Sequence, residues 1–449
     1  MKTTLDEATF NGLLSRLRDV QEAFVARYPG ELAQRQPVHT VYGGAHLFKA
    51  DTARKLGELA LGSLALHAPE PDALAEAIGI DPAIAAPVYA RVTEKLKREP
   101  VEDFRIDFED GYGNRPDDEE DRHAEVAALE VAKGMAGGTL PPFLGIRIKP
   151  LSGDLGARSI RTLDLFLSAL VAKTGGNLPG NFVVTLPKIT SPDHVAVLVE
   201  VFQSLEKSFG LPALSLRMEF MIETPQVILD PSGQSMLPSI LTAARGRCVS
   251  AHFGTYDYTA GCSITASLQR MRHPACDFAK HMMQVAYAST GIWLSDGATN
   301  IMPVAPYRAA EGKPLSEEQV RENQRVVYAA WRMHADDIRH SLQNGYYQGW
   351  DLHPAQLPTR YATVYAFFLQ GYKAASQRLE NFISKAAQAT LVGDVFDDAA
   401  TGQGLLNFFL RGVNCGALTE DEALKTGITL EELRGRSFLK ILKNRRKMT

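Results

Sequence analysis

Charged side chains follow several short apolar runs in this sequence, and their types indicate metal-assisted carboxylate chemistry. In FRIDFEDGYG, residues 104–113, an apolar run ends in Asp107, Glu109 and Asp110. Further runs end in other ionisable residues, namely Arg147, Lys188, Glu223, Asp257, Asp296 and His353. Carboxylate oxygens from two strands suit a hard divalent cation such as Mg²⁺ or Mn²⁺. Because an arginine offers a two-pronged donor to a substrate carboxylate, the set predicts a site for an α-oxo acid or a related carboxylate.

A cation that chelates the oxo group would stabilise an enolate or alkoxide, which is the difficult part of making or breaking a C–C bond beside a carbonyl. Each signal alone has a structural alternative. An acidic strand end also serves as an N-cap for the next helix, and a lone Arg147 can pair with a structural carboxylate. His353, before a proline, can position its loop, and His39 and His46 are interpreted as structural. The prediction therefore depends on the ordered set.

These residues need elements that bring them together, and the chain alternates strand patterns with helix patterns. The predicted strands cover 38–48, 102–110, 143–150, 181–189, 216–224, 247–257, 291–297 and 349–354. Several are nearly continuous apolar runs, as expected for parallel strands buried on both faces. Amphipathic stretches lie between most of them; 191–210 has Ser191 as an N-cap and Gly210 as a stop. The alternation predicts an α/β fold, a (β/α)8 TIM barrel, with a doubly wound open sheet as the alternative. In a barrel, the charged strand ends converge on one rim.

Two regions fall outside this alternation. Residues 51–100 are predicted to form a helical insertion after the first strand, and residues 376–449 a helical C-terminal cap without a strand. An N-terminal helical segment at 1–37 leaves the barrel at 38–375. The basic end of the chain, RGRSFLKILKNRRKMT, is either a solvated helix or a surface for an anionic ligand.

Bulk composition narrows the function classes. The 449 residues are 45% hydrophobic and 22% charged, which is typical of soluble globular proteins. A net charge of −4 gives no indication of a nucleic-acid partner or an anionic membrane. The N-terminus has no apolar signal region, and no run of about 18 apolar residues occurs, so we expect a cytoplasmic protein. The four cysteines show neither a CxxC pair nor zinc spacing, which fits reduced thiols.

The motifs, taken in order, resemble those of a known family. They are DFED (107–110), IRIKP (146–150), LPK (186–188), MIET (221–224), FGTYDYTAG (253–261), DG (296–297) and GWDLHPAQL (349–357). This order resembles the citrate lyase β-subunit-like group of the HpcH/HpaI aldolase and malate synthase superfamily, over residues 38 to 400. The resemblance implies a (β/α)8 barrel of the phosphoenolpyruvate/pyruvate-binding type.

The resemblance also implies roles for individual residues. Glu223 and Asp257 match the family's metal ligands, and Arg147 matches the arginine that holds the substrate carboxylate or carbonyl. Asp107 and Glu109 match the acidic pair behind the metal. Lys188, Asp296 and His353 are expected to bind substrate, whereas Asp110 is expected to serve the following loop.

The family's acid/base aspartate lies in a C-terminal motif that often reaches a neighbouring subunit's site, which implies a homo-oligomer. Here the corresponding stretch is GDVFD, so Asp397 is the candidate, with Asp394 and Asp398 beside it as alternatives. A water on the metal is the other candidate for proton transfer.

Three departures from the family leave the substrate open. Residues 51–100 replace a short connection, Thr255 and Tyr256 precede the metal-binding aspartate, and His46 lacks the histidine motif of the aldolases. The predicted function is a Mg²⁺-dependent carbon–carbon lyase or aldolase that acts on a β-hydroxy acid or its CoA thioester through an enolate. The alternatives are a class II aldolase that uses free pyruvate or another 2-oxo acid with an aldehyde, and a non-catalytic barrel that binds a carboxylate.

Overall fold

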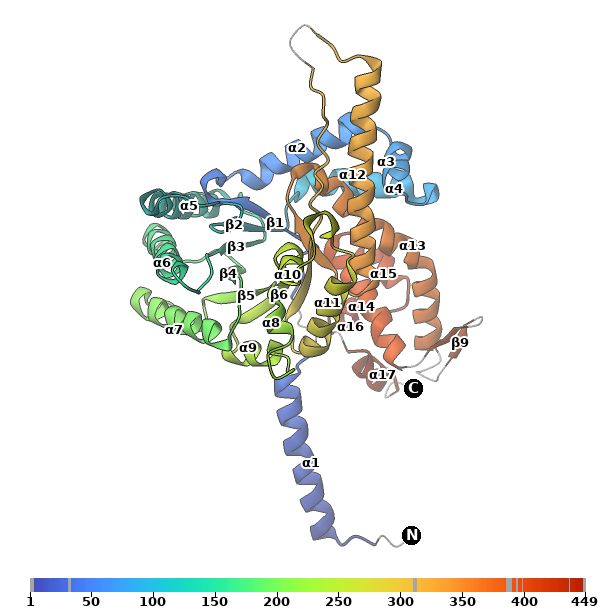
Figure 1. The fold of residues 1–449 in the computed structure, drawn as a ribbon. Helices are drawn as coiled ribbons and strands as arrows, with labels where there is room; N and C mark the ends of the chain where they lie inside the picture. The colour runs from blue at the N-terminus through green and yellow to red at the C-terminus, as the bar shows by residue number, and fades with distance from the viewer. Residues whose placement is uncertain are drawn as a thin grey trace.

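A closed barrel of eight parallel strands, in chain order, forms the centre of the computed structural model (Figure 1). The structure describes residues 4–30, 34–309, 313–384, 390–392, 395–397, 399–435 and 437–446. The barrel strands are β1 His39–Gly44, β2 Asp103–Asp107, β3 Phe143–Arg147, β4 Phe182–Leu186, β5 Arg217–Ile222, β6 Cys248–Phe253, β7 Trp293–Ala298 and β8 Gln348–Asp351. Because β1 pairs with both β2 and β8, the sheet closes, which confirms the predicted (β/α)8 barrel and excludes the open sheet.

Helices surround this barrel. They are α5 Asp117–Gly137, α6 Leu155–Thr174, α7 Pro192–Phe209, α9 Leu237–Ala243, α11 Pro274–Tyr287, α12 Glu317–Gln343 and α13 Leu357–Ser384. As predicted, the Ser191 side chain accepts a hydrogen bond from the Asp193 N–H at the start of α7. Gly210, at φ +66°, ends that helix in the left-handed region, where glycine avoids a Cβ clash. Two short helices, α8 Pro225–Ile228 and α10 Thr255–Gly261, follow β5 and β6.

The insertion between β1 and β2 consists of α2 Thr52–His67, α3 Pro71–Ile78 and α4 Ala85–Arg98. It packs against the outer helices α12 and α13. From α12, Arg332 Nε donates to the Ala77 carbonyl at 3.1 Å, and the Tyr328 hydroxyl donates to the His67 carbonyl at 2.9 Å. These bonds satisfy carbonyls at the ends of α3 and α2, which otherwise lack helical partners.

The C-terminal region contains α14 Ala399–Cys415, α15 Glu420–Leu424, α16 Leu430–Gly435 and α17 Phe438–Arg446. It also contains an antiparallel pair that we did not expect in a helical cap, β9 Thr390–Val392 with β10 Val395–Asp397. The expected boundary at 375/376 falls inside α13. The division into segments 1–37, 38–375 and 376–449 stays a prediction.

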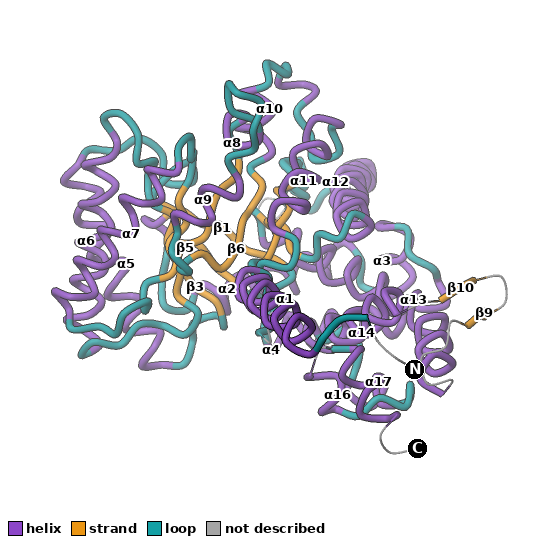
Figure 2. Tube along the Cα trace, turned by 90° about the horizontal axis from the view of Figure 1, so that it is seen from below, coloured by secondary structure: helices purple, strands orange, loops and turns teal. Residues whose placement is uncertain are grey.

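The first helix, α1 Glu7–Arg27, extends away from the barrel (Figures 1 and 2). The Asp6 side chain caps it by accepting a hydrogen bond from the Thr9 N–H at 2.8 Å, and no residue of α1 is buried. The chain meets the barrel at Gly30, whose N–H donates to the Ser289 carbonyl at 2.9 Å. Within the described ranges, no helix is long and apolar enough to cross a bilayer.

The interior of the barrel is polar, although the strands read as nearly apolar runs. On β2, Phe104 lies against Phe48 outside the barrel, whereas Asp103 and Arg105 reach across its inside. Arg105 donates to both oxygens of Glu219, from Nε at 2.9 Å and from Nη2 at 2.6 Å, and it also pairs with Asp103. We call Asp103, Arg105 and Glu219 the inner cluster. Its charges are tolerated in the interior because they are paired and hydrogen-bonded.

An aromatic layer separates the inner cluster from the rim. Tyr42, Met221, Ala298 and Trp350 form a small buried apolar group apart from the main core. The Tyr42 and Trp350 ring centroids lie 4.6 Å apart, and the Tyr42 hydroxyl donates to Glu219 at 3.4 Å. Tyr42 therefore contacts the inner cluster through its hydroxyl, and its ring forms part of the layer beneath the rim.

Candidate active site at the carboxyl ends of the strands

Arg147, at the end of β3, is held by the end of β2. Asp107 and Arg147 are register partners, so their side chains meet inside the barrel. Arg147 Nε donates to Asp107 Oδ1 at 2.7 Å, Nη2 donates to the other oxygen, and Nη1 lies 3.0 Å from Glu109 Oε2. The guanidinium also lies 4.9 Å from the centroid of the Tyr42 ring. A bidentate pair and a stacked ring fix the direction of the third nitrogen, Nη1, at the rim.

Lys188, after β4, joins the same group. Its Nζ donates to Glu109 and lies 3.4 Å from Asp110 Oδ2 and 3.6 Å from Asp257 Oδ1. Burial disfavours the charged amine, but the carboxylates of Glu223 and Glu109 outweigh burial and raise the pKa of Lys188. The Lys188 backbone has φ +49°, which is uncommon for a residue with a Cβ and concentrates at functional sites. This backbone geometry aims the Lys188 N–H at Glu223 Oε1, 2.7 Å away.

Glu223 follows β5 and has the most perturbed carboxyl group of this set. Burial raises its pKa to about 8, and repulsion by the Asp257 carboxylate adds to the shift. The side chain of Asp257, in the first turn of α10, is 40% exposed. A Cβ at Gly254 would lie 2.4 Å from Glu223 Oε2, so this glycine leaves the space that the carboxylate fills. We call these residues the rim cluster: Asp107, Glu109, Asp110, Arg147, Lys188, Glu223 and Asp257.

The rim cluster has more negative than positive groups. Five carboxylates face two cations, Arg147 and Lys188, so three negative charges are unbalanced when all are ionised. A divalent cation beside Glu223 and Asp257 would reduce both the burial penalty and the repulsion, so these residues fit the predicted metal ligands. Among the described residues, no three His, Cys, Asp or Glu side chains are grouped to bind a metal ion together. Two carboxylates suit Mg²⁺, which keeps several water ligands.

Two predicted substrate-binding residues, Asp296 and His353, make their hydrogen bonds to groups outside the rim cluster. The Asp296 carboxylate is fully buried, and its Oδ2 accepts from Lys280 Nζ at 3.0 Å and from Ser341 Oγ at 2.7 Å. His353 caps a short turn, where its Nδ1 accepts from the Ala355 N–H at 3.2 Å. Both side chains therefore have structural partners, as strand-end acids and histidines before proline commonly do.

The proposed acid/base is not located by the structure. Asp397 lies in β10, paired through its backbone with Thr390, and its side chain lies outside the described part of the chain. Asp394 and Asp398 also lie outside the described residues.

The sequence interpretation missed two features of the rim. Asp110 was expected to serve the next loop, but its carboxylate faces Lys188 and lies 3.9 Å from Arg147 Nη1. The loop turns after β2, so strict alternation no longer holds there. Tyr42 was not predicted at all. Side chains two residues apart on a strand point to the same face. Because Thr40 bonds Asp103 inside the barrel, the same alternation places Tyr42 inside as well.

Two buried polar atoms near these residues have no hydrogen-bond partner among the described residues. They are Thr255 Oγ1, directly after β6, and Trp350 Nε1, whose ring packs on Tyr42. Since buried donors are rarely left unpaired, both are candidates to bind a polar ligand at the rim.

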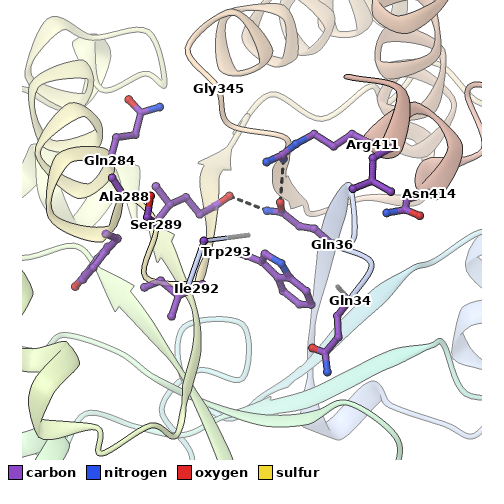
Figure 3. A pocket seen from close by; sticks show the side chains of 15 residues that line it. Gln34, Gln36, Gln284, Ala288, Ser289, Ile292, Trp293, Gly345, Arg411 and Asn414 are labelled. Carbon is purple, nitrogen blue, oxygen red and sulfur yellow. Dashed lines mark hydrogen bonds between the residues drawn. The ribbon is translucent and has the colours of Figure 1, made fainter. Parts of the chain in front are cut away.

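Cavities open at the opposite end of the barrel. One of about 340 Å³ is lined by Gln36, Trp293, Arg411 and neighbouring residues (Figure 3). There, Gln36 Nε2 donates to the Leu294 carbonyl at 3.1 Å, and Arg411 Nη1 donates to Gln36 Oε1 at 3.3 Å. The described lining of this cavity contains no carboxylate, whereas the carboxylates of Asp103 and Glu219, which line a second cavity of about 330 Å³ at this end, are already paired with Arg105. We therefore place the candidate active site at the rim, where barrel enzymes have theirs.

Comparison with solved structures shows the same fold in one protein and a weaker likeness to two others. A citrate lyase from Burkholderia xenovorans LB400 is 20% identical over 86% of this chain and 95% of that chain, with a TM-score of 0.55. A malate synthase from Haloferax volcanii is 14% identical over 92% of this chain and 98% of that chain, with a TM-score of 0.46. An HpcH/HpaI aldolase/citrate lyase family protein from Burkholderia cenocepacia J2315 is 12% identical over 77% and 95% of the chains, with a TM-score of 0.38.

A search of the curated proteins found no match. A family model does match, and it covers residues 17–441, which include the whole barrel and every residue of the rim cluster. The chain therefore belongs to the family described as Domain of unknown function (DUF6986).

Proposed function

We propose that this chain is a Mg²⁺-dependent carbon–carbon lyase or aldolase that acts on a β-hydroxy acid or its CoA thioester. The observation that carries the proposal is the rim cluster, which combines an oriented arginine with unbalanced carboxylates at the end of a barrel. The motif resemblance supports the same chemistry. A bound Mg²⁺ or Mn²⁺ would act as a Lewis acid toward a carbonyl oxygen.

The residues of the chain have separable roles in this proposal. Arg147 binds the substrate carboxylate through Nη1, which exchanges its contact with Glu109 for the ligand. Asp107 positions Arg147 through the bidentate pair. Glu223 and Asp257 are the ligands for the cation, and Lys188 neutralises Glu109 and Asp110 beside it.

The substrate has two candidate forms. A free 2-oxo acid such as pyruvate needs only the carboxylate clamp and the cation. A CoA thioester also needs cations for the phosphates, and the candidates that the sequence offers are Lys49, Lys188 and the basic C-terminus. Asp397 remains the proposed proton-transfer residue in both forms.

Calorimetric titration with MgCl₂ and MnCl₂ tests the metal ligands. The unchanged chain should bind one equivalent of either ion, and Asp257→Asn should weaken binding at least about tenfold, which corresponds to about 1.4 kcal/mol. The matched control is Asp118→Asn, which removes an exposed carboxylate from the first turn of α5 and should bind like the unchanged chain. Equal binding by the Asp257 variant would reject the metal assignment.

Thermal unfolding with ligands then separates the substrate classes. Oxaloacetate, pyruvate, glyoxylate and acetyl-CoA are added singly, each with and without Mg²⁺, because a bound ligand raises the melting temperature with its occupancy. A Mg²⁺-dependent shift with a 2-oxo acid alone favours the aldolase form, and one with acetyl-CoA favours the thioester form. Binding without any product by mass spectrometry, when acetyl-CoA or a 2-oxo acid is supplied together with glyoxylate as the acceptor, would instead indicate a non-catalytic carboxylate-binding barrel.

A further inference from the structure

An apolar stripe runs along the exposed helix α1. Phe10, Leu13, Leu17, Val20 and Phe24 are spaced three and four residues apart, and each is between 43% and 67% exposed. This spacing is the a/d pattern of a coiled coil, in which two apolar positions recur every seven residues. Figure 1 shows that α1 projects from the barrel and that no other helix of the described chain lies along it.

Such a stripe is not a stable arrangement for a lone helix in water. Helical stability in proteins comes mostly from packing of the apolar face, and isolated helices of this length are marginal. The ring of Phe24 contacts only Tyr28 among the described aromatic residues, and both lie on the same segment. The stripe therefore requires a partner outside the fold of a single chain.

The charges of α1 select the kind of partner. Glu7, Asp19 and Glu22 balance Arg16, Arg18 and Arg27, so the helix has no net charge. A helix that binds an anionic membrane has a polar face rich in Lys and Arg, which this balance does not provide. Partners with a strong charge of either sign gain nothing from it. A second α1, equally neutral and with the same stripe, approaches without net repulsion.

We propose that α1 is a self-association element and that its partner is α1 of a second copy of this chain. Leu17 is the central residue of the stripe, with Phe10 and Phe24 equally far on either side. It therefore lies close to its own counterpart whether the two helices run parallel or antiparallel. This inference does not depend on the proposed enzymatic function.

Sedimentation velocity of the full chain, over a range of concentrations, tests the proposal. Leu17→Glu places a charge in the stripe, while the matched control Ser15→Glu places the same charge on the exposed opposite face. Glutamate is a good helix former, so neither change should unfold α1. We expect Leu17→Glu to halve the mass and Ser15→Glu to keep it. A monomeric unchanged chain, or equal masses for both variants, would overturn the proposal.

Charge complementation identifies the partner segment. Leu17→Lys should also halve the mass, and mixing it with Leu17→Glu should restore the mass of the unchanged chain, because the two helices then carry opposite charges at their contact. Failure to recover shows that Leu17 packs on another surface and rejects the helix pair. Flotation of the unchanged chain with phosphatidylcholine–phosphatidylserine vesicles, without association in solution, would assign the stripe to lipid instead. Circular dichroism and the melting temperature of each variant check that the barrel is intact.

Discussion

Glu219 and Glu223 are inward-facing residues four positions apart at β5, yet the pKa of one carboxyl group is lowered and that of the other is raised. Burial works against the charge of both. At Glu219, Arg105 and His252 outweigh burial and hold the pKa well below its ordinary value. At Glu223, burial and then the Asp257 charge raise the pKa to about 8.

The difference lies in what each carboxylate accepts. Glu219 receives two hydrogen bonds from Arg105 and one from each of Thr185, Ser250 and Tyr42, so its charge is well compensated. Glu223 receives the backbone N–H of Lys188, and its nearest charged neighbours include Asp257. The inner cluster, with two carboxylates and Arg105, has one excess negative charge, whereas the rim cluster has three and therefore leaves more charge for a ligand to balance. Perturbed carboxyl groups of the second kind are typical of functional sites.

Replacing each glutamate by glutamine should therefore change the stability in different ways. Glu219→Gln should have the larger effect on the free energy of unfolding. It leaves Arg105 without a charged bidentate partner in the barrel, and breaking a buried pair typically lowers the free energy of unfolding by about 3 kcal/mol. Urea unfolding followed by tryptophan fluorescence measures this. Glu125→Gln, at an exposed position on α5, is the control. Little change at Glu219 would mean that the inner cluster is not a unit of stability.

Glu223→Gln should remove a pH dependence instead of removing stability. Because the folded pKa is raised, the folded state holds one more proton than the unfolded state between pH 4.5 and about 8. The free energy of unfolding should fall as pH rises through this window, by up to about 1.4 kcal/mol per pH unit. Urea unfolding without divalent ions at pH 6 and 8.5 should show a smaller decrease in the variant. An unchanged decrease would contradict the assignment.

The affinity for Mg²⁺ should depend on the protonation of Glu223 in the same way. A carboxyl ligand must be ionised, so Mg²⁺ affinity of the unchanged chain should rise between pH 6.5 and 8, by up to about tenfold per pH unit. Calorimetry at both pH values measures the effect, and Asp118→Asn should retain it. Affinity that is independent of pH would show that Glu223 is not a ligand.

Asp107→Asn should weaken ligand binding more than it weakens the fold. The variant keeps an oxygen that can accept from Arg147 but loses the charge of the pair, so we expect a loss of about 2 kcal/mol in stability. Arg147 is then less well oriented, and the rise in melting temperature caused by oxaloacetate with Mg²⁺ should shrink. If that rise stays the same, Arg147 does not bind the ligand.

The smallest effect is expected where the two clusters meet. Tyr42→Phe keeps the ring beneath Arg147 and removes only the long hydrogen bond to Glu219, 3.4 Å. A loss of about 0.5–1 kcal/mol in the free energy of unfolding should follow, with oxaloacetate binding unchanged. A large loss of binding would show that the hydroxyl couples the clusters.

The sequence by itself determined where the strands lie, because buried strands need apolar outward-facing residues and helical stretches separate them. It also determined that Asp107, Arg147, Lys188, Glu223 and Asp257 stand at strand ends. Closure of the sheet then brings strand ends together, so the rim could be predicted. Asp296 and His353 also follow strands, but the side chain of Asp296 bonds Lys280 and that of His353 bonds a backbone N–H two residues on. The strand pattern does not encode these partners.

Only the tertiary structure decided which charges are balanced. The pairing of Arg105 with Glu219 joins β2 to β5 across the barrel interior, a contact that no local pattern encodes. The same holds for the deficit at Glu223, since a pKa depends on the distances to charges from four other strand ends. The apolar stripe of α1 was equally present in the sequence, but only the fold revealed that no part of the described chain covers it. Sequence patterns indicate which side chains must be buried, whereas three-dimensional packing determines which groups each of them contacts.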